Sequence, residues 1–230
     1  MAAYRRLHAQ FRLLKVRLAV FDCDGTLSDG EAAVCAAMNA AFALHRLPPP
    51  SRNQVRRIVG LSLPQAMARL APESPGEEQA LLVDAYKDAF RQSRLDGTLR
   101  EPLFDGVGSL LRGLKAAGWQ LGVATGKSDR GLASTLAVHG LGDLFATLQT
   151  ADRHPSKPHP AMLLAAMDEA SAEPGDTVMI GDTVYDMEMA QVAGARALGV
   201  AWGYHEPDEL LAAGAETVVQ TPRELLDMLA

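Results

Sequence analysis

Residues 16–27 read Val-Arg-Leu-Ala-Val-Phe-Asp-Cys-Asp-Gly-Thr-Leu, a mostly apolar run that ends abruptly in two aspartates and a glycine. A short run that is apolar on both faces is typical of a strand buried in a parallel sheet. In an open sheet of that kind, ligands bind beyond the carboxyl ends of the strands. The sequence therefore predicts that Asp22 and Asp24 lie where a ligand can reach them. The plainer alternative is a common Asp-Gly turn.

Further along the chain, strand-like apolar runs alternate with segments of helical spacing. The alternation of strand and helix predicts an α/β fold, with a Rossmann-like parallel sheet and right-handed crossovers. The expected strands besides the first are Trp119–Ala124, Thr177–Ile180, Arg196–Trp202 and Glu216–Val219. The expected helices between them are Val107–Ala117, Arg130–His139, Pro160–Ala170 and Val184–Ala193.

One region breaks this alternation, because residues 30–96 contain no convincing strand. Proline-rich breaks at 48–50 and 71–75 divide it into expected helices. We therefore predict a discontinuous α/β core of residues 1–28 and 98–230, with an inserted all-helical cap domain at 29–97 and hinges at 28–30 and 96–104. The expected cap helices are Glu31–His45, Arg52–Val59, Leu63–Leu70 and Gly76–Arg94.

Composition and charge exclude several classes of protein. The 230 residues are 48% hydrophobic and 22% charged, as in an ordinary globular chain. A formal net charge of −6 argues against a nucleic-acid polymer as partner. No apolar stretch reaches the ~18 residues needed to span a membrane. Two cysteines cannot form a disulfide framework, so we expect reduced thiols in a cytoplasmic protein.

The first 15 residues form a basic extension without acids. A signal peptide would follow such charges with a longer apolar segment and a cleavage site. Here the short apolar run leads directly into Asp22, so we expect no secretory leader.

Two further segments carry candidate phosphate-binding groups. Thr125-Gly126-Lys127 follows the second expected strand, but a P-loop would need glycine where Leu121 stands. The Thr125 hydroxyl could hold an anion or simply cap a helix. Lys157 lies in a proline-flanked loop before a helix, where a solvated surface lysine is the alternative. His154 and His159 flank it, but two loop histidines are a weak metal signal.

Asp182 follows the third apolar run directly, and Asp186 lies four residues on. Helix capping and a favourable helix dipole explain one of these acids better than both. Together the four segments bring four carboxylates, one hydroxyl and one lysine to strand ends. Crowded carboxylates repel unless a cation joins them, and Mg²⁺ prefers oxygen ligands that it shares with substrate phosphate.

These four segments, in this order, resemble the motifs of the haloacid dehalogenase superfamily of phosphotransferases. The resemblance runs from about residue 16 to residue 229, and the helical insert is similar to the family's type-one cap. It implies that Asp22 is a nucleophile that becomes phosphorylated, and that Asp24 is the general acid and base. It implies further that Thr125, Gly126 and Lys157 bind the phosphoryl group.

For the metal, the resemblance implies Mg²⁺ bound by Asp22, the backbone carbonyl of Asp24, and Asp182. Asp186 would support the site through a metal-bound water or a contact with Lys157. Because Asp24 is present, an ester phosphatase is favoured over a phosphonatase or a dehalogenase. Leu63 stands where β-phosphoglucomutases carry a cap arginine, which lowers the mutase alternative.

Residues 58–64 and 194–205 resemble the phosphoglycolate phosphatase branch. We therefore expect a phosphatase of small phosphomonoesters such as 2-phosphoglycolate, acting as a monomer or homodimer without membrane partners. A sugar phosphatase, nucleotidase, pyrophosphatase, phosphomutase or non-catalytic phospho-ligand-binding relative stays open. The candidate cap contacts for the substrate's second anionic group are Arg56, Arg57, Gly60 and Lys87.

Overall fold

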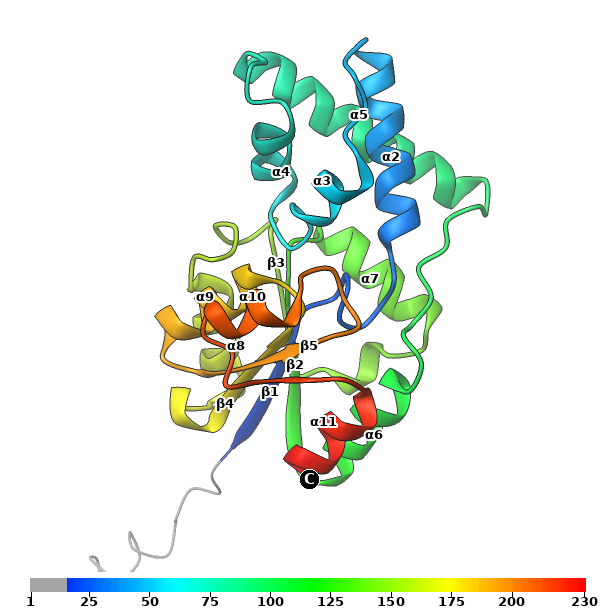
Figure 1. Cartoon of the computed structure of the whole chain (residues 1–230). Helices are drawn as coiled ribbons and strands as arrows, with labels where there is room; N and C mark the ends of the chain where they lie inside the picture. Colours follow the sequence, from blue (N-terminus) through cyan, green and yellow to red (C-terminus); the bar gives the residue numbers. More distant parts are fainter. Residues whose placement is uncertain (1–15) are drawn as a thin grey trace, which may run out of the picture.

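A computed structural model describes residues 16–230, which form a parallel six-stranded sheet with helices on both faces and a helical cap at one end (Figure 1). The strand order is β3-β2-β1-β4-β5-β6, so β1 lies at the centre between β2 and β4. The strands are β1 (Arg17–Phe21), β2 (Trp119–Thr125), β3 (Thr147–Thr150), β4 (Thr177–Gly181), β5 (Arg196–Val200) and β6 (Thr217–Val219).

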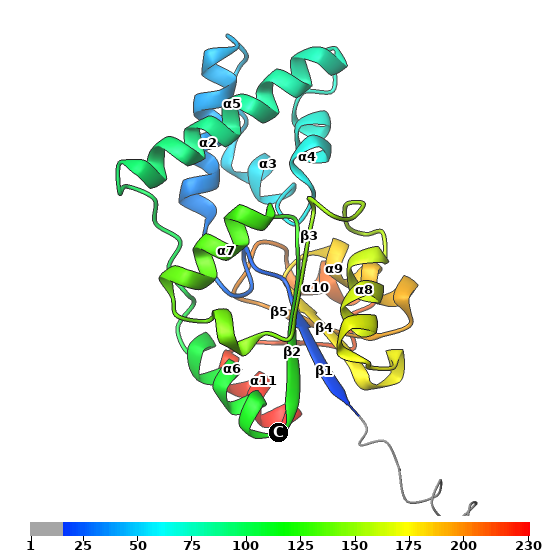
Figure 2. The same ribbon diagram turned by 180° about the vertical axis from the view of Figure 1, so that it is seen from behind.

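Alternate side chains of each strand supply two hydrophobic layers, one on each face of the sheet. In β1, Ala19 and Phe21 pack with helices α6, α7 and α11, whereas Leu18 and Val20 pack with α8, α9 and α10. The two groups of helices lie on opposite sides of the strands in Figures 1 and 2. Their bounds are α6 (Val107–Ala116), α7 (Asp129–Val138), α8 (Ala161–Ala170), α9 (Val184–Ala193), α10 (Pro207–Ala212) and α11 (Pro222–Leu229). Among the described residues, the α/β part of the chain also contains the short 3₁₀ helices η1 (Gly142–Leu144) and η2 (Pro174–Asp176).

The predicted α/β class and parallel sheet are confirmed. Five of the strands were expected, and their ends differ from the prediction by a residue or two. The largest difference is at β5, which ends at Val200 rather than at the expected Trp202. Strand β3 was not expected at all. The short helices α10 and α11 were also not expected.

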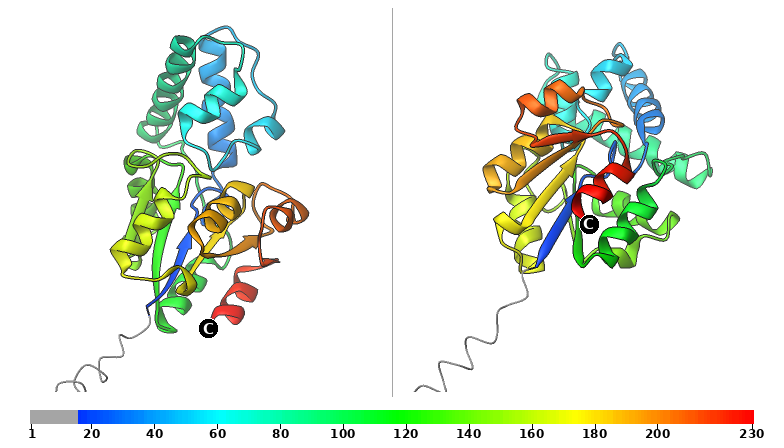
Figure 3. Two further views of the ribbon diagram at one scale, coloured as in Figure 1. Left: turned by 90° about the vertical axis from the view of Figure 1, so that its left-hand side faces the viewer. Right: turned by 60° about the horizontal axis from the view of Figure 1, so that its bottom comes forward.

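Four helices between β1 and β2 form the cap, which lies beyond the carboxyl ends of the strands (Figure 3). The predicted helix at 52–59 is shorter than expected, because it ends at Arg56 and gives way to a turn that carries Gly60 at φ +94°. The boundaries of the two domains, after residue 28 and before residue 98, stay a prediction. The helices are α2 (Glu31–Leu44), α3 (Arg52–Arg56), α4 (Leu63–Leu70) and α5 (Gly76–Leu95).

The cap has a hydrophobic core of its own, and two tyrosines of the α/β part of the chain extend it. Met38 of α2, Met67 of α4 and Leu82 of α5 are buried together, and Tyr185 and Tyr204 of the core pack against the same cluster. The Tyr185 hydroxyl donates a hydrogen bond to the Arg57 carbonyl at 2.8 Å. The cap therefore rests on the sheet domain through apolar as well as polar contacts.

No helix within residues 16–230 is long and apolar enough to cross a bilayer. Cys23 and Cys35 are both free thiols, as expected. The basic extension predicted for residues 1–15 lies outside the described residues.

Candidate active site

The central strands bring three of the predicted site residues to one place. Asp22 follows β1, Thr125 ends β2, and Asp182 follows β4. These strands are neighbours in the sheet, and the chain order reverses between β1 and β4. Such a switch point is where open α/β sheets bind their ligands.

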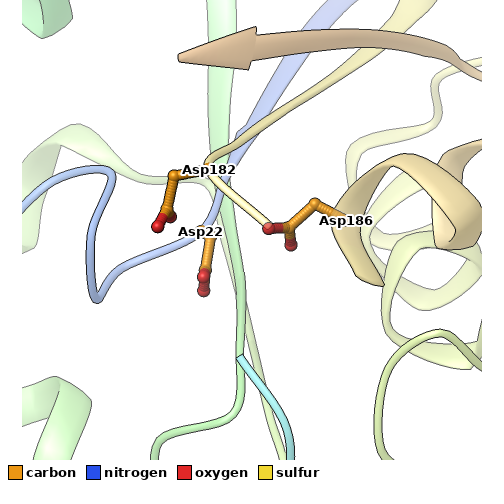
Figure 4. Close-up of side chains that lie close together, drawn as sticks. All are labelled: Asp22, Asp182 and Asp186. Carbon is orange, nitrogen blue, oxygen red and sulfur yellow. The ribbon is translucent and has the colours of Figure 1, made fainter. Parts of the chain in front are cut away.

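Asp22, Asp182 and Asp186 form a buried carboxylate cluster, in which oxygens of the three side chains lie within 4.8 Å of one another. Figure 4 shows the Asp186 side chain leaving helix α9 beside those of Asp22 and Asp182. The Thr26 hydroxyl donates to Asp182 at 2.7 Å, and the backbone N–H of Tyr204 donates to its other oxygen at 3.0 Å. These bonds fix the orientation of Asp182 beside Asp22.

Lys157 is the cation of this cluster. Its ammonium nitrogen lies 2.9 Å from Asp22 Oδ1 and 2.6 Å from Asp186 Oδ1, and the lysine is fully buried. The two carboxylates raise the pKa of Lys157 against the lowering effect of burial, so that the ammonium stays charged. The alternative of a solvated surface lysine does not hold.

Asp186 serves two purposes at once. Its Oδ2 accepts hydrogen bonds from the Thr183 N–H at 3.1 Å and the Thr183 hydroxyl at 2.7 Å, which caps helix α9. Its Oδ1 accepts from Lys157. Of the two supporting roles expected for Asp186, the contact with Lys157 is present.

The electrostatics of the site fit a divalent cation. Burial raises the pKa of Asp22 to about 6 against the opposing effect of Lys157, and it raises the pKa of Asp182 well above its ordinary range. Asp22 Oδ2 is buried without a hydrogen-bond partner among the described residues. An unpartnered carboxylate oxygen beside a second buried carboxylate is what a hard, oxygen-liganded ion such as Mg²⁺ requires. The residues present therefore fit a hard divalent cation.

Asp24 belongs to a second ionic cluster that the sequence analysis missed. Lys127 Nζ lies 3.0 Å from Asp24 Oδ1 and 2.5 Å from Glu101 Oε1. Burial raises the pKa of Asp24 to about 6, while Lys127 lowers it. Lys127 directly follows Gly126 at a strand end, which could have marked it as a site residue. Glu101 carries no such local signal.

Glycines let the surrounding loops approach the carboxylates. A Cβ at Gly25, where φ is +90°, would lie 2.1 Å from Asp182 Oδ2, and one at Gly203 would lie 2.1 Å from the Asp182 Cβ. Only glycine fits such close approaches and such a φ. The two loops therefore enclose Asp182 from both sides.

The cap closes over the site at Gly126. A Cβ there would lie 2.4 Å from the Leu61 carbonyl oxygen and 2.8 Å from that of Gly60. The Ser62 N–H donates to Ser156 Oγ at 2.7 Å, beside the loop that carries Lys157. The cap turn at 60–62 thus contacts both phosphate-binding segments expected from the sequence.

A cavity of about 750 Å³ lies between cap and sheet. Asp22, Asp24 and Thr125 line it on the side of the sheet, and apolar, cationic and acidic side chains line the rest. Thr125 Oγ1 accepts the Lys127 N–H at 3.2 Å, while Ser128 caps helix α7. The cap residues on the wall are Val34, Met38, Ile58, Val59, Gly60, Leu61, Ser62, Leu63, Pro64, Ala66, Asp84, Tyr86, Lys87, Asp88, Phe90, Arg91 and Arg94.

Of the four cap positions expected to contact substrate, Gly60 and Lys87 line the cavity, and Arg56 and Arg57 do not. Arg56 donates to the carbonyls of Gly203 at 3.1 Å and Tyr204 at 3.2 Å. Arg57 makes a two-pronged ion pair with Glu209 at 2.7 and 2.6 Å. Both arginines thus bond across the cap–core contact and are absent from the cavity lining.

The loop histidines do not form a metal site with the described carboxylates. His154 contacts the Gln149 side chain at 2.7 Å, and His159 accepts the Ala161 N–H at 3.2 Å. Within residues 16–230, the cluster that could hold a metal is that of Asp22, Asp182 and Asp186.

Comparison with known proteins places the chain in a family. A family model described as haloacid dehalogenase-like hydrolase matches residues 19–200. The probable phosphatase IndB of Dickeya dadantii is 36% identical, with 91% of each chain covered. The N-acetylmuramic acid 6-phosphate phosphatase of Pseudomonas aeruginosa is 31% identical over 94% of this chain and 96% of its own. A phosphoglycolate phosphatase of Xylella fastidiosa is 32% identical, with 91% of each covered.

A solved structure shares the whole architecture. The hydrolase from Pseudomonas syringae superposes with a TM-score of 0.79 at 25% identity, over 93% of this chain and 97% of its own. These matches confirm the predicted superfamily, the resemblance to phosphoglycolate phosphatases and the predicted class of enzyme, a phosphatase. With its carboxylate cluster at the sheet's switch point, the chain belongs to the haloacid dehalogenase-like hydrolases.

Proposed function

We propose that this protein is a Mg²⁺-dependent phosphomonoester hydrolase that works through an aspartyl phosphate on Asp22. The observation that carries the proposal is the state of Asp22 itself. Its carboxylate lines the cavity, one oxygen has no hydrogen-bond partner among the described residues, and the other is held by Lys157 at 2.9 Å. A carboxylate nucleophile splits a difficult hydrolysis into two easier displacements.

In the first displacement, Asp22 attacks phosphorus and the ester oxygen leaves as the alcohol. Thr125, Gly126 and Lys157 bind the phosphoryl oxygens, where the transferring group carries its charge. Asp24, at the cavity wall, donates a proton to the leaving oxygen. Its pKa of about 6, raised by burial, suits a group that must give and take a proton near neutral pH.

In the second displacement, water attacks the phosphorus of the aspartyl phosphate and Asp24 accepts the proton of that water. The P–O bond to Asp22 breaks, and inorganic phosphate leaves with the carboxylate restored. The close approach of the cap turn at 60–62 to Gly126 limits the entry of bulk water during both steps.

Asp22, the Asp24 carbonyl and Asp182 would hold the metal, and Asp186 would orient Lys157 beside it. When bound, Mg²⁺ supplies charge that neutralises the phosphoryl oxygens and offsets the repulsion among the carboxylates. The residues of the chain do the rest: they orient the phosphoryl group, deliver the nucleophile and move the proton.

For the substrate, 2-phosphoglycolate is the first candidate, because a relative that is 32% identical carries the name phosphoglycolate phosphatase. A larger phosphorylated carboxylic acid, such as N-acetylmuramic acid 6-phosphate, is the second. The observation that favours the second is the size of the cavity. Its volume of about 750 Å³ far exceeds that of a two-carbon acid, and apolar side chains in its lining would pack against a larger substrate. Lys87, Arg91 and Arg130 line the cavity and could bind a carboxylate in either case.

Phosphate release from a panel of phosphomonoesters, each with Mg²⁺ and with EDTA, tests the proposal. The panel contains phosphoglycolate, N-acetylmuramic acid 6-phosphate, simple sugar phosphates, nucleotides and pyrophosphate. Mg²⁺-dependent release from at least one ester is expected, and the preferred ester decides between the two candidates. Isomeric products without free phosphate would indicate a mutase, and no turnover of any compound would indicate a non-catalytic relative.

A further inference from the structure

We propose that Lys127 and Glu101 act as a pair that positions Asp24 for proton transfer to the leaving group. This inference rests on the proposed function, since it assigns a task to residues around the proposed acid. Neither residue belongs to the nucleophile, metal or phosphoryl-binding sets described above. Lys127 makes ion pairs with the carboxylates of Asp24 and Glu101.

Lys127 holds one oxygen of Asp24. Its ammonium lies 3.0 Å from Asp24 Oδ1, and its side chain is only 10% exposed, against 13% for that of Asp24. A charge-assisted contact in a poorly hydrated site restricts side-chain rotation more than the same contact at a surface. With Oδ1 held, the other oxygen of Asp24 is the one available to a ligand in the cavity that Asp24 lines.

Glu101 holds Lys127 in turn. Its Oε1 lies 2.5 Å from the ammonium, and its Oε2 accepts the Thr135 hydroxyl of α7 at 3.3 Å. The Glu101 carbonyl contacts His139 Nε2 at 2.8 Å. Glu101 is therefore anchored to helix α7 by its side chain, and to the residue that follows α7 by its backbone carbonyl.

Two chain segments run side by side next to this cluster: the loop that follows Asp24 and the segment that returns from the cap. Ser28 and Leu103 form an antiparallel bridge, and the Asp29 N–H donates to the Pro102 carbonyl at 2.8 Å. Glu101 stands at this crossing. A Cβ on Gly30 would lie 2.8 Å from Asp24 Oδ1, so glycine there leaves room for the held carboxylate.

The need for a second carboxylate follows from the chemistry asked of Asp24. An acid that gives up and regains a proton cannot serve as a constant counter-charge for an ammonium that is nearly buried. Leaving such a charge unpaired is costly. Glu101 takes no part in the proton transfer, so it keeps Lys127 paired in both states of Asp24. Lys127 then stays in place throughout the cycle.

A plain structural role for the same ion pairs makes a different prediction. A salt bridge that only ties the cap segment to the core affects stability, and it affects every substrate alike. A positioning role affects only those reactions that need the acid. Esters with a poor leaving group need a proton at the departing oxygen, whereas 2,4-dinitrophenolate leaves without one.

The test compares kcat/KM for an alkyl phosphate that the wild type hydrolyses with kcat/KM for 2,4-dinitrophenyl phosphate. The value of kcat/KM depends on the steps up to the formation of the aspartyl phosphate. It does not depend on the later attack of water, in which Asp24 acts as a base. We expect Lys127→Met to lower it about 100-fold for the alkyl ester and less than about 3-fold for the dinitrophenyl ester, since general acids contribute ~10²–10⁴-fold. The isosteric Glu101→Gln should lower kcat/KM about 10-fold for the alkyl ester and leave that for the dinitrophenyl ester nearly unchanged. For the alkyl ester, the double variant should have a kcat/KM no lower than that of Lys127→Met alone.

Glu209→Gln is the matched control, because it breaks a cap–core ion pair outside the cavity. It should leave the ratio of the two kcat/KM values unchanged. Equal losses on both esters in Lys127→Met and Glu101→Gln, or no loss on either, would overturn the positioning role and leave the proposed function intact. A wild-type protein that hydrolyses neither ester would instead overturn the proposed function itself.

Discussion

The ammonium nitrogen of Lys157 lies 2.9 Å from Oδ1 of Asp22, and both side chains are buried. The contact joins the loop before α8 to the end of the central strand. A buried ammonium is costly unless carboxylates surround it, and here it lies against two. The same contact therefore contributes to the stability of the fold and to the chemistry proposed for Asp22.

Lys157→Met should destabilise the metal-free protein and abolish phosphate release. Removing one partner of a buried ion pair costs about 3–5 kcal/mol, which corresponds to a fall in Tm of roughly 6–20 °C for a chain of this size. Without the ammonium, the pKa of Asp22 rises further, so the protein loses more stability as pH increases. The fall in Tm should be larger at pH 8 than at pH 5.

Thermal melts at the two pH values measure this effect, with the exposed Lys115 changed to Met as the control. The control loses only exposed hydrogen bonds to the Asp143 and Leu144 carbonyls, so it should melt within about 3 °C of the wild type at both pH values. An equal fall in Tm for both variants would contradict the role assigned to Lys157.

Mg²⁺ should stabilise the protein more at pH 7.5 than at pH 5. Burial raises the pKa values of Asp22 and Asp24 from 3.8 to about 6. Both groups therefore bind protons on folding, and the metal-free protein loses stability as pH rises from about 4 through 6. A cation binds the charged form of the carboxylates. The stability that it adds is therefore fully present only above about pH 6, where these groups are charged in the folded protein.

Melts with Mg²⁺ at 100 times its Kd should show a rise in Tm of about 5–10 °C at pH 7.5, and EDTA should reverse it. The rise at pH 5 should be clearly smaller. A Mg²⁺ effect that is absent, or the same at both pH values, would contradict a metal site at these carboxylates.

A strand could be predicted from the sequence where it is buried and its residues are mostly apolar, as in β1 and β4. Strand β3 could not, because its sequence is Thr-Leu-Gln-Thr. Its polar side chains are buried with partners from elsewhere in the chain: Thr147 donates to Glu169 at 2.6 Å, and Gln149 contacts His154 at 2.7 Å. Hydropathy alone cannot anticipate buried polar groups that tertiary contacts satisfy.

The site residues divide in the same way. Asp22, Thr125 and Asp182 could be predicted because each stands at the end of an apolar strand. Glu101 could not, since only the folded chain brings it to Lys127. Arg56 was a candidate contact for the substrate's second anionic group because of its charge, and in the folded chain it donates to backbone carbonyls at the cap–core contact.

Asp182→Asn should weaken the response to Mg²⁺. Asp182 offers a buried carboxylate within 4.8 Å of Asp22 and Asp186, and the change removes its charge while keeping its shape. The Mg²⁺ concentration for half-maximal phosphate release should rise at least about 10–100-fold, the range seen when groups around a metal are altered. Asp208→Asn, at an exposed position of α10, is the control. An unchanged Mg²⁺ titration in Asp182→Asn would argue against Asp182 as a ligand.

Gly126→Ala should impair catalysis with little effect on folding. The new Cβ would lie 2.4 Å from the Leu61 carbonyl oxygen, so the cap turn must move away from the site. Displacements near 1 Å can cost about 100-fold in rate. We expect kcat/KM to fall by about 10–100-fold, with Tm within about 3 °C of the wild type.

Gly142→Ala is the matched control for Gly126→Ala, because a Cβ at Gly142 meets nothing within 4 Å. It should retain the activity of the wild type. Full activity in Gly126→Ala would mean that the close approach of the cap turn is not needed for turnover.

The most direct test of the central claim is chemical trapping of the phosphorylated enzyme. Borohydride reduces an aspartyl phosphate to homoserine, and peptide mass spectrometry locates the change. In wild type quenched during turnover with Mg²⁺, residue 22 should be converted to homoserine, and Asp22→Asn should show neither conversion nor phosphate release. Turnover without homoserine at position 22, or with homoserine at another aspartate, would contradict the assignment of Asp22 as the nucleophile.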